Sequence, residues 1–133
     1  MYFIFLILQK GSVGVTEPFL KDAKRMCLIA QELDIDKEQE ATFNKYLGEI
    51  FFQEKNPNQA LFFLQYAKQF YLKERLMFLH ELEEITTLQV IIHYKTANTL
   101  EKYYPNETQK LLEVQFEVSR LENEVKAYRE SKK

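Results

Sequence analysis

Glycine and proline are scarce in this chain. Its 133 residues contain three Gly and three Pro, and neither residue occurs between Pro57 and Pro105. Alternating Val and Thr patterns, which are typical of strands, are also rare, whereas Leu, Glu, Lys, Gln and Phe are abundant. The shortage of turn formers and of strand patterns predicts an all-helical (all-α) fold. A chain of this length is expected to form one domain, residues 1–133.

Cysteine is represented by a single residue, Cys27, which cannot form an internal disulfide. A reducing compartment is the simpler expectation, and we predict a cytoplasmic protein. The neighbours of this residue are Met26, Leu28 and Ile29. A packed thiol is therefore expected rather than a nucleophile.

No surplus of positive charge marks the chain. Its 18 basic and 20 acidic residues give a net charge of −2, and they are interspersed along the sequence instead of forming a basic stripe. Direct binding to nucleic acid is therefore not expected.

Patterns that would indicate catalysis or a cofactor are equally sparse. Gly11 and Gly14 are followed neither by a third glycine nor by the Lys-Ser or Lys-Thr of a phosphate-binding loop. His80 and His93 would be about 140° apart around a single helix, and neither has a Cys or His partner at metal-ligand spacing. We predict a non-enzymatic protein with no cofactor and no metal site.

The most apolar run of the sequence is short. Residues 2–8 read YFIFLIL, and the run ends at Gln9-Lys10. No basic residue precedes it, as one would in a secretory signal, and it is too short to span a bilayer. We expect a buried helix and no membrane partner. Attachment to a membrane surface through residues 1–8 is an alternative.

Residues 41–73 carry the most specific pattern. Small residues stand where two helices of a hairpin would touch, with larger apolar residues beside them: Gly48, Ala60 and Ala67, then Phe51 and Leu64. Together with Leu47, this spacing resembles the tetratricopeptide repeat (TPR), a helix-turn-helix unit of about 34 residues. Two positions depart from the family pattern, because Asn44 replaces an aromatic residue and no proline stands near Leu72.

The resemblance implies a TPR-like antiparallel array of about six helices. Sliding the chain by 44 positions pairs Phe19-Leu20 with Phe63-Leu64 and lays the Gly-rich turn at residues 11–14 on another turn, which indicates repeated hairpins. The expected hairpins are residues 1–33, 37–73 and 76–131, the last with a long C-terminal helix. The expected helices are residues 2–10, 16–33, 37–54, 57–73, 76–103 and 106–130, with a tight turn at residues 73–75.

In this family the first helix of each hairpin lines a groove that holds a peptide. By resemblance, the groove residues here are Lys45, Glu49, Phe52, Gln53, Gln89 and His93. Some members hold a peptide carboxylate with a Lys and an Asn one turn later; Lys45 matches this pattern, but Glu49 stands at the Asn position. This substitution suggests a partner with a basic or amide group near Glu49. The alternative is that Lys45 and Glu49 form an ordinary pair on the helix surface.

The last helix carries a second pattern. Apolar residues recur at intervals of three and four from Leu111 to Tyr128, as in a coiled-coil seam. Leu112 and Phe116 widen the apolar face in the first half, so we expect that half to pack on the rest of the chain. A capping helix and a seam that pairs two chains into a homodimer are both open. The expected interface residues are Tyr2, Phe3, Phe5, Leu6, Val118, Leu121, Val125 and Tyr128.

The resemblance predicts a protein- or peptide-binding module. Its long irregular repeats and polar last helix look most like the peptide-sensing domains of bacterial pheromone-responsive regulators, of which this chain would be the C-terminal part. The alternative is a structural dimerisation or scaffold module that uses the seam and the apolar N-terminal helix.

Overall fold

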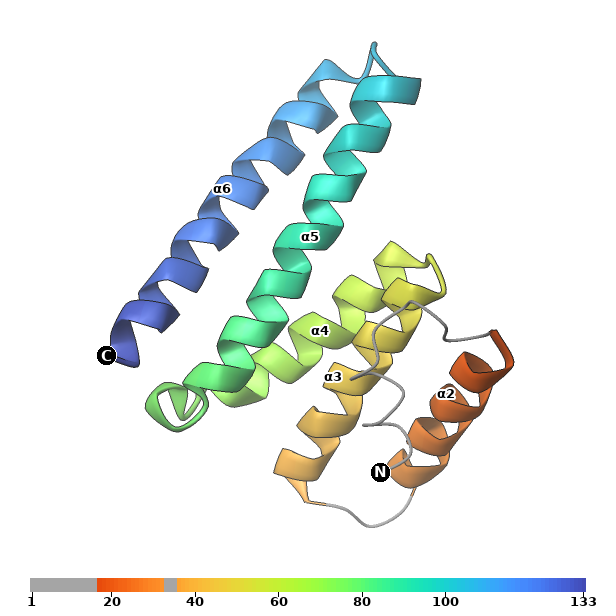
Figure 1. The fold of residues 1–133 in the computed structure, drawn as a ribbon, viewed down its shortest axis with the longest axis vertical. Coiled ribbons are helices and arrows are strands. Elements are labelled where there is room, and N and C mark those ends of the chain that lie inside the picture. Colours follow the sequence, from red (N-terminus) through yellow and green to blue (C-terminus); the bar gives the residue numbers. More distant parts are fainter. Residues whose placement is uncertain (1–16, 33–35) are drawn as a thin grey trace. The chain divides into compact units, whose positions relative to one another are not determined.

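The computed structural model describes residues 17–32 and 36–133, which are almost entirely helical (Figure 1). Within these ranges there is no strand, so the all-helical prediction is confirmed. The predicted helix at residues 2–10 lies outside the described residues, and the count of six helices stays a prediction. The elements are α2 (Glu17–Gln31), α3 (Lys37–Gln53), α4 (Pro57–Leu72), the short 3-10 helix η1 (Arg75–Met77), α5 (Leu79–Tyr103) and α6 (Thr108–Ser131).

Contacts along the chain divide it into two compact units, Met1–Lys73 (unit 1) and Glu74–Lys133 (unit 2). Among the described residues, unit 1 contains α2, α3 and α4, with α3 packed against both of the others, and unit 2 contains η1, α5 and α6 (Figure 1). The boundary falls between the second and third predicted hairpins. A single domain spanning residues 1–133 stays a prediction.

Local sequence signals set the first residues of α3 and α4. The Asp36 carboxylate accepts a hydrogen bond from the Gln39 backbone nitrogen at 2.8 Å, and the Gln39 side chain accepts one from the Asp36 backbone nitrogen at 3.4 Å. This is the capping box that the sequence indicates. The Asn56 side chain accepts a hydrogen bond from the Gln59 backbone nitrogen at 3.3 Å and caps α4. Both helices begin at the predicted residue and end one residue before the predicted end.

The contact between α3 and α4 depends on Gly48. A Cβ atom at this position would lie 2.6 Å from Cγ of Leu64 and 3.2 Å from the backbone oxygen of Ala60. Leu64, Ala60 and Ala67 are completely buried. Because carbon atoms do not approach one another so closely, only glycine allows the two helices to pack at this distance. The prediction that the small residue Gly48 lets α3 and α4 approach closely is confirmed.

An apolar cluster lies beside this contact in unit 1. It joins Phe43, Leu47 and Ile50 of α3 to Cys27 of α2, and all four are buried. Burial raises the pKa of the Cys27 thiol to about 12, so the thiol stays protonated at neutral pH. Cys27 is a packed thiol, as predicted.

Lys24 ties α2 to the end of α3. Its Nζ lies 3.1 Å from Oε1 of Glu54 and 4.7 Å from the centre of the Phe51 ring. Phe51 in turn stacks on Phe63 of α4 with ring centres 5.4 Å apart. The Lys24 cation of α2 thus contacts an aromatic pair that joins α3 to α4.

The boundary between α4 and α5 lies where a turn is predicted. Helix α4 ends at Leu72, the chain turns at Lys73 and Glu74, and η1 follows. Helix α5 begins at Leu79, three residues after the predicted start. Two apolar side chains of η1 point into solvent, since Leu76 is 79% and Met77 is 72% exposed.

In unit 2, α6 runs antiparallel to α5 and packs on it (Figure 1). The buried residues of α6 belong to the predicted seam: Val118, Leu121, Val125 and Tyr128. The expectation for Leu112 and Phe116 is wrong, because they are 61% and 72% exposed. They lie about 120° and 160° around the helix from Val118, on a side of α6 that no other element of unit 2 covers.

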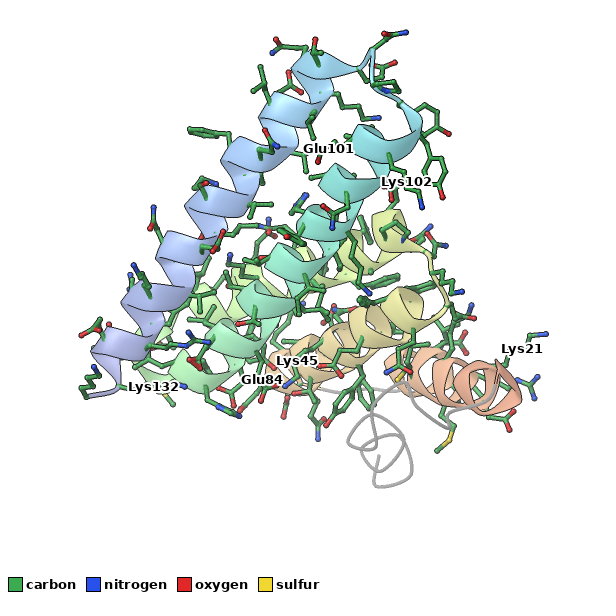
Figure 2. All side chains as sticks on the ribbon, turned by 45° about the horizontal axis from the view of Figure 1, so that its top comes forward. Lys21, Lys45, Glu84, Glu101, Lys102 and Lys132 are labelled. Atoms are coloured by element: carbon green, nitrogen blue, oxygen red, sulfur yellow. The ribbon has the colours of Figure 1, made fainter. Side chains whose placement is uncertain are left out.

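An ion-pair cluster joins the beginning of α5 to the end of α6. The Glu83 carboxylate accepts hydrogen bonds from Lys132 Nζ and from Arg129 Nε, each at 2.9 Å. These two donors, Lys132 first, lower the pKa of Glu83 below its usual value. Figure 2 shows Lys132 at this end of the helix pair, while Glu101 and Lys102 lie at the opposite end of α5.

Within residues 17–32 and 36–133, no helix has both the length and the apolar character needed to cross a bilayer.

Candidate functional site

Four of the predicted groove residues lie on α3. Lys45, Glu49, Phe52 and Gln53 are all half-buried. Lys45, Glu49 and Gln53 are spaced by four residues, so they form a row along one side of the helix, named here the α3 row. Oε1 of Gln53 is shielded from solvent and accepts no hydrogen bond from the described part of the chain. A buried acceptor without a donor is rare and costs free energy, so Gln53 has unused hydrogen-bonding capacity.

The other two predicted groove residues, Gln89 and His93, lie one turn apart on α5. Gln89 is buried and His93 is half-buried. Because α5 belongs to unit 2 and α3 to unit 1, the structure brings residues together only within each of the two sets. A groove that combines both sets stays a prediction.

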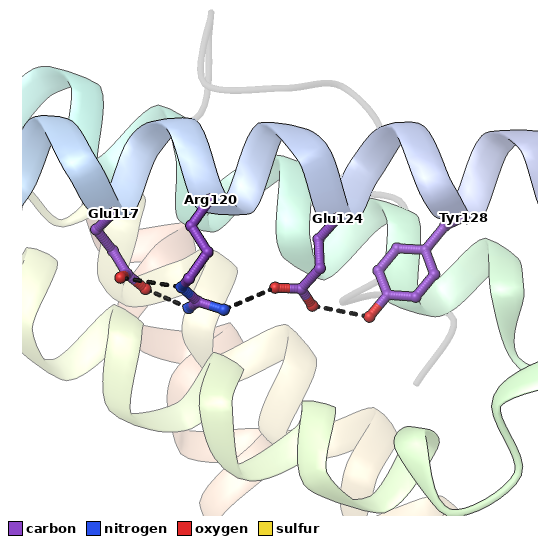
Figure 3. Close-up of polar contacts among 4 residues, drawn as sticks. All are labelled: Glu117, Arg120, Glu124 and Tyr128. Atoms are coloured by element: carbon purple, nitrogen blue, oxygen red, sulfur yellow. Dashed lines mark hydrogen bonds and ion pairs between the residues drawn. The ribbon is translucent and has the colours of Figure 1, made fainter.

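A chain of polar contacts along α6 was not predicted from the sequence (Figure 3). We name it the α6 ladder: Glu117, Arg120, Glu124 and Tyr128. Arg120 donates hydrogen bonds to both carboxylate oxygens of Glu117 and, through Nη1 at 3.1 Å, to Glu124. The Tyr128 hydroxyl donates to Oε1 of Glu124 at 2.9 Å. Opposite charges at spacings of three and four residues are the signal that could have revealed this ladder.

Charged residues of the α6 ladder affect the pKa of His93 on α5. Burial lowers the pKa of His93; the nearby Glu117 raises it in part, and Arg120 lowers it further. Burial, together with the hydrogen bond to Glu124, raises the pKa of Tyr128 to about 12. Tyr128 is therefore uncharged at neutral pH, the neutral form of His93 is favoured, and the single positive charge of Arg120 lies between the two carboxylates of Glu117 and Glu124.

Protonation of His93 is expected to destabilise unit 2. Because its folded-state pKa is below the usual 6.5, the unfolded chain binds more protons than the folded chain in the pH range below 6.5. Stability present at neutral pH is therefore lost as the pH falls through that range. We expect His93→Gln to weaken this pH dependence, as measured by urea unfolding at pH 7.5 and 5.5. The control is His80→Gln, since the His80 side chain is 70% exposed. Equal pH dependence in the two variants would show that His93 has no such role.

The predicted interface residues fall into two groups. Tyr2, Phe3, Phe5 and Leu6 lie outside the described residues. The other four are at most 9% exposed within one chain, on the side of α6 that packs on α5: Val118, Leu121, Val125 and Tyr128. Pairing of two chains through this seam would require α5 and α6 to separate.

Surface hollows among the described residues include two that the sequence did not indicate. One, of about 420 Å³, lies between α5 and α6 of unit 2 and is lined by residues that include Thr87, Ser119 and Lys126. The other, of about 220 Å³, lies between the first half of α3 and the second half of α4. We name the latter the α3–α4 groove. Both hollows depend on which side chains face each other across two helices, and the sequence alone does not show this.

Within the described part of the chain, no group of three or more His, Cys, Asp or Glu side chains is placed to hold a metal ion. Comparison of the chain with protein-family models, with curated proteins and with solved structures gives no match. The structure thus defines the class only as an all-helical protein whose described residues form two compact helical units.

Proposed function

We propose that the chain is a non-enzymatic, TPR-like module that binds a protein or peptide. In this proposal α3 and α4 form one repeat hairpin, and α5 and α6 form the next. The close packing of Gly48 against Leu64 and Ala60 supports the first hairpin, because small residues at the helix crossing are the feature that the repeat pattern requires. A narrower form of the proposal is a peptide-sensing regulator in which a bound peptide alters partner binding.

The proposal of peptide binding rests on the unused hydrogen-bond acceptor of Gln53. A peptide backbone offers N–H donors, and a ligand that donates one to Gln53 Oε1 would satisfy an atom that has no partner in the described chain. Because this atom is shielded from solvent, the proposal requires the Gln53 side chain to rotate outward when the ligand binds. The α3 row spans about 12 Å from Lys45 to Gln53, which matches about four residues of an extended peptide. The proposed ligand also presents a basic or amide group to Glu49 and an acidic group to Lys45.

Selection of peptides against the full chain tests this proposal. We expect panning of a random dodecapeptide phage library to enrich sequences that bind the full chain when synthesised. Their affinity should fall about tenfold in Glu49→Lys and in Gln53→Leu, since each change removes a recognition contact. The control Lys21→Glu reverses a charge on the exposed surface of α2 and should leave affinity unchanged. A failure to enrich peptides, or binding that is indifferent to both α3 variants, would contradict the proposal.

A further inference from the structure

The α3–α4 groove has a small, buried floor and taller walls. Ala41 and Asn44 of α3 are 2% and 3% exposed and line its floor. Tyr66 and Phe70 of α4 stand beside them, and Tyr66 is 51% exposed. Because side chains as small as Ala41 and Asn44 do not fill the space between the helices, the hollow remains open to solvent.

Three polar side chains at this groove, from α4 and its C-cap residue, have no partner among the described residues. Tyr66, Gln69 and Lys73 are among the residues that line it, and their side chains make no hydrogen bond or ion pair with the described residues. Among the described residues, Glu40 is the one acidic residue that lines the groove, and its Oε2 lies 3.6 Å from Nζ of Lys37. The charge of Lys73 is therefore not neutralised within the groove.

We propose that the α3–α4 groove binds an acidic, extended peptide segment of a partner protein. All three free groups can donate hydrogen bonds, so the ligand must offer acceptors, which the carbonyl groups of an extended backbone and a carboxylate provide. The residues at 66, 69 and 73 follow one side of α4 over about 10 Å, the length of about three extended residues. The carboxylate lies at the Lys73 end, and the apolar part of the segment lies against Tyr66 and Phe70.

The size of the groove favours a peptide over a compact small molecule. Its volume of about 220 Å³ is below the range of about 300–1,000 Å³ that is usual for small-molecule pockets. The site is also separate from the α3 row, because residues 40 and 44 lie about 100° to 180° around α3 from residues 45 and 49. It therefore goes beyond the function proposed above and can be tested separately.

Nuclear magnetic resonance on the full ¹⁵N-labelled chain tests the inference. The probe is acetyl-Ala-Val-Asp-Glu-amide, and its neutral counterpart is acetyl-Ala-Val-Asn-Gln-amide. We expect the acidic peptide to shift the backbone amides of Ala41 and Lys73 and the side-chain amide of Gln69, and the neutral peptide to bind about fivefold more weakly. Because the contact with Lys73 is exposed, added salt should weaken the binding of the acidic peptide.

Two variants and one control complete the test. Lys73→Glu should reduce affinity about tenfold, and Tyr66→Phe, which removes only a hydroxyl, should reduce it by about threefold. Both positions are exposed, so both variants are expected to fold. Lys21→Glu makes the same charge change elsewhere in unit 1 and should leave affinity unchanged.

Three outcomes overturn the inference: equal affinity for the two peptides, no effect of Lys73→Glu, or no shift at the groove. Shifts confined to Lys45, Glu49 and Gln53 would overturn it while leaving the proposed function intact. Peptide binding at the groove, together with selected peptides whose affinity is unchanged in Glu49→Lys and Gln53→Leu, would support the inference and count against the proposed function.

Discussion

Replacement of Leu121 by Glu is expected to unfold the α5–α6 pair. Leu121 is 2% exposed and lies on the side of α6 that packs on α5. The substitution removes the packing of a buried leucine, a loss of about 2–5 kcal/mol, and it adds the cost of an unpaired carboxylate in an apolar interior, which is several kcal/mol more. The total approaches the whole stability of a small domain, about 5–15 kcal/mol.

Circular dichroism and light scattering together show whether the seam joins α5 to α6 within one chain or joins two chains. We expect Leu121→Glu to lose much of its helical signal and its cooperative melting, whereas Asn123→Glu, which places the same charge at an exposed position of α6, should melt like the natural chain. If the seam instead joins two chains, the natural protein is a dimer and Leu121→Glu is a folded monomer. That second result would contradict an intramolecular seam and support the dimerisation module.

The helix ends of unit 1 could be predicted from the sequence because they depend on neighbouring residues. Asp36 and Gln39 are three residues apart, and their reciprocal hydrogen bonds define the first turn of α3 wherever that helix lies. Asn56 and Pro57 act in the same local way at α4. The Gly48 contact was also predictable, since a glycine inside a helix costs free energy and therefore indicates a close approach.

The surroundings of each helix could not be predicted in the same way. Periodicity shows that Leu112 and Phe116 widen the apolar face of α6, but it does not show how many elements cover that helix. The α3–α4 groove likewise depends on Ala41 of one helix lying near Tyr66 of another. The α6 ladder was readable from its spacing, yet its proximity to His93 needs the antiparallel packing of α5 and α6.

Replacement of Gly48 by Ala is expected to destabilise unit 1 in spite of the better helix propensity of alanine. Propensity alone would stabilise α3 by about 1 kcal/mol. The added methyl group, however, would lie 2.6 Å from Cγ and 2.7 Å from Cδ2 of Leu64, and Leu64 is completely buried and has no free space to enter. Overpacking of this kind costs about 1–3 kcal/mol, so we expect a net loss that urea unfolding can measure.

A double-mutant cycle with Leu64→Ala separates this steric effect from any other consequence of changing Gly48. Leu64→Ala alone should cost about 2–5 kcal/mol, because it leaves a cavity. In that background the methyl group of Gly48→Ala enters the cavity, and the same substitution should become neutral or stabilising; the contact with the Ala60 oxygen at 3.2 Å limits the gain. The coupling energy between the two sites should therefore be about 1 kcal/mol or more. Additive effects, or a stabilising Gly48→Ala in the natural background, would mean that α3 and α4 do not meet at Gly48, and the hairpin on which the proposed function rests would lose its support.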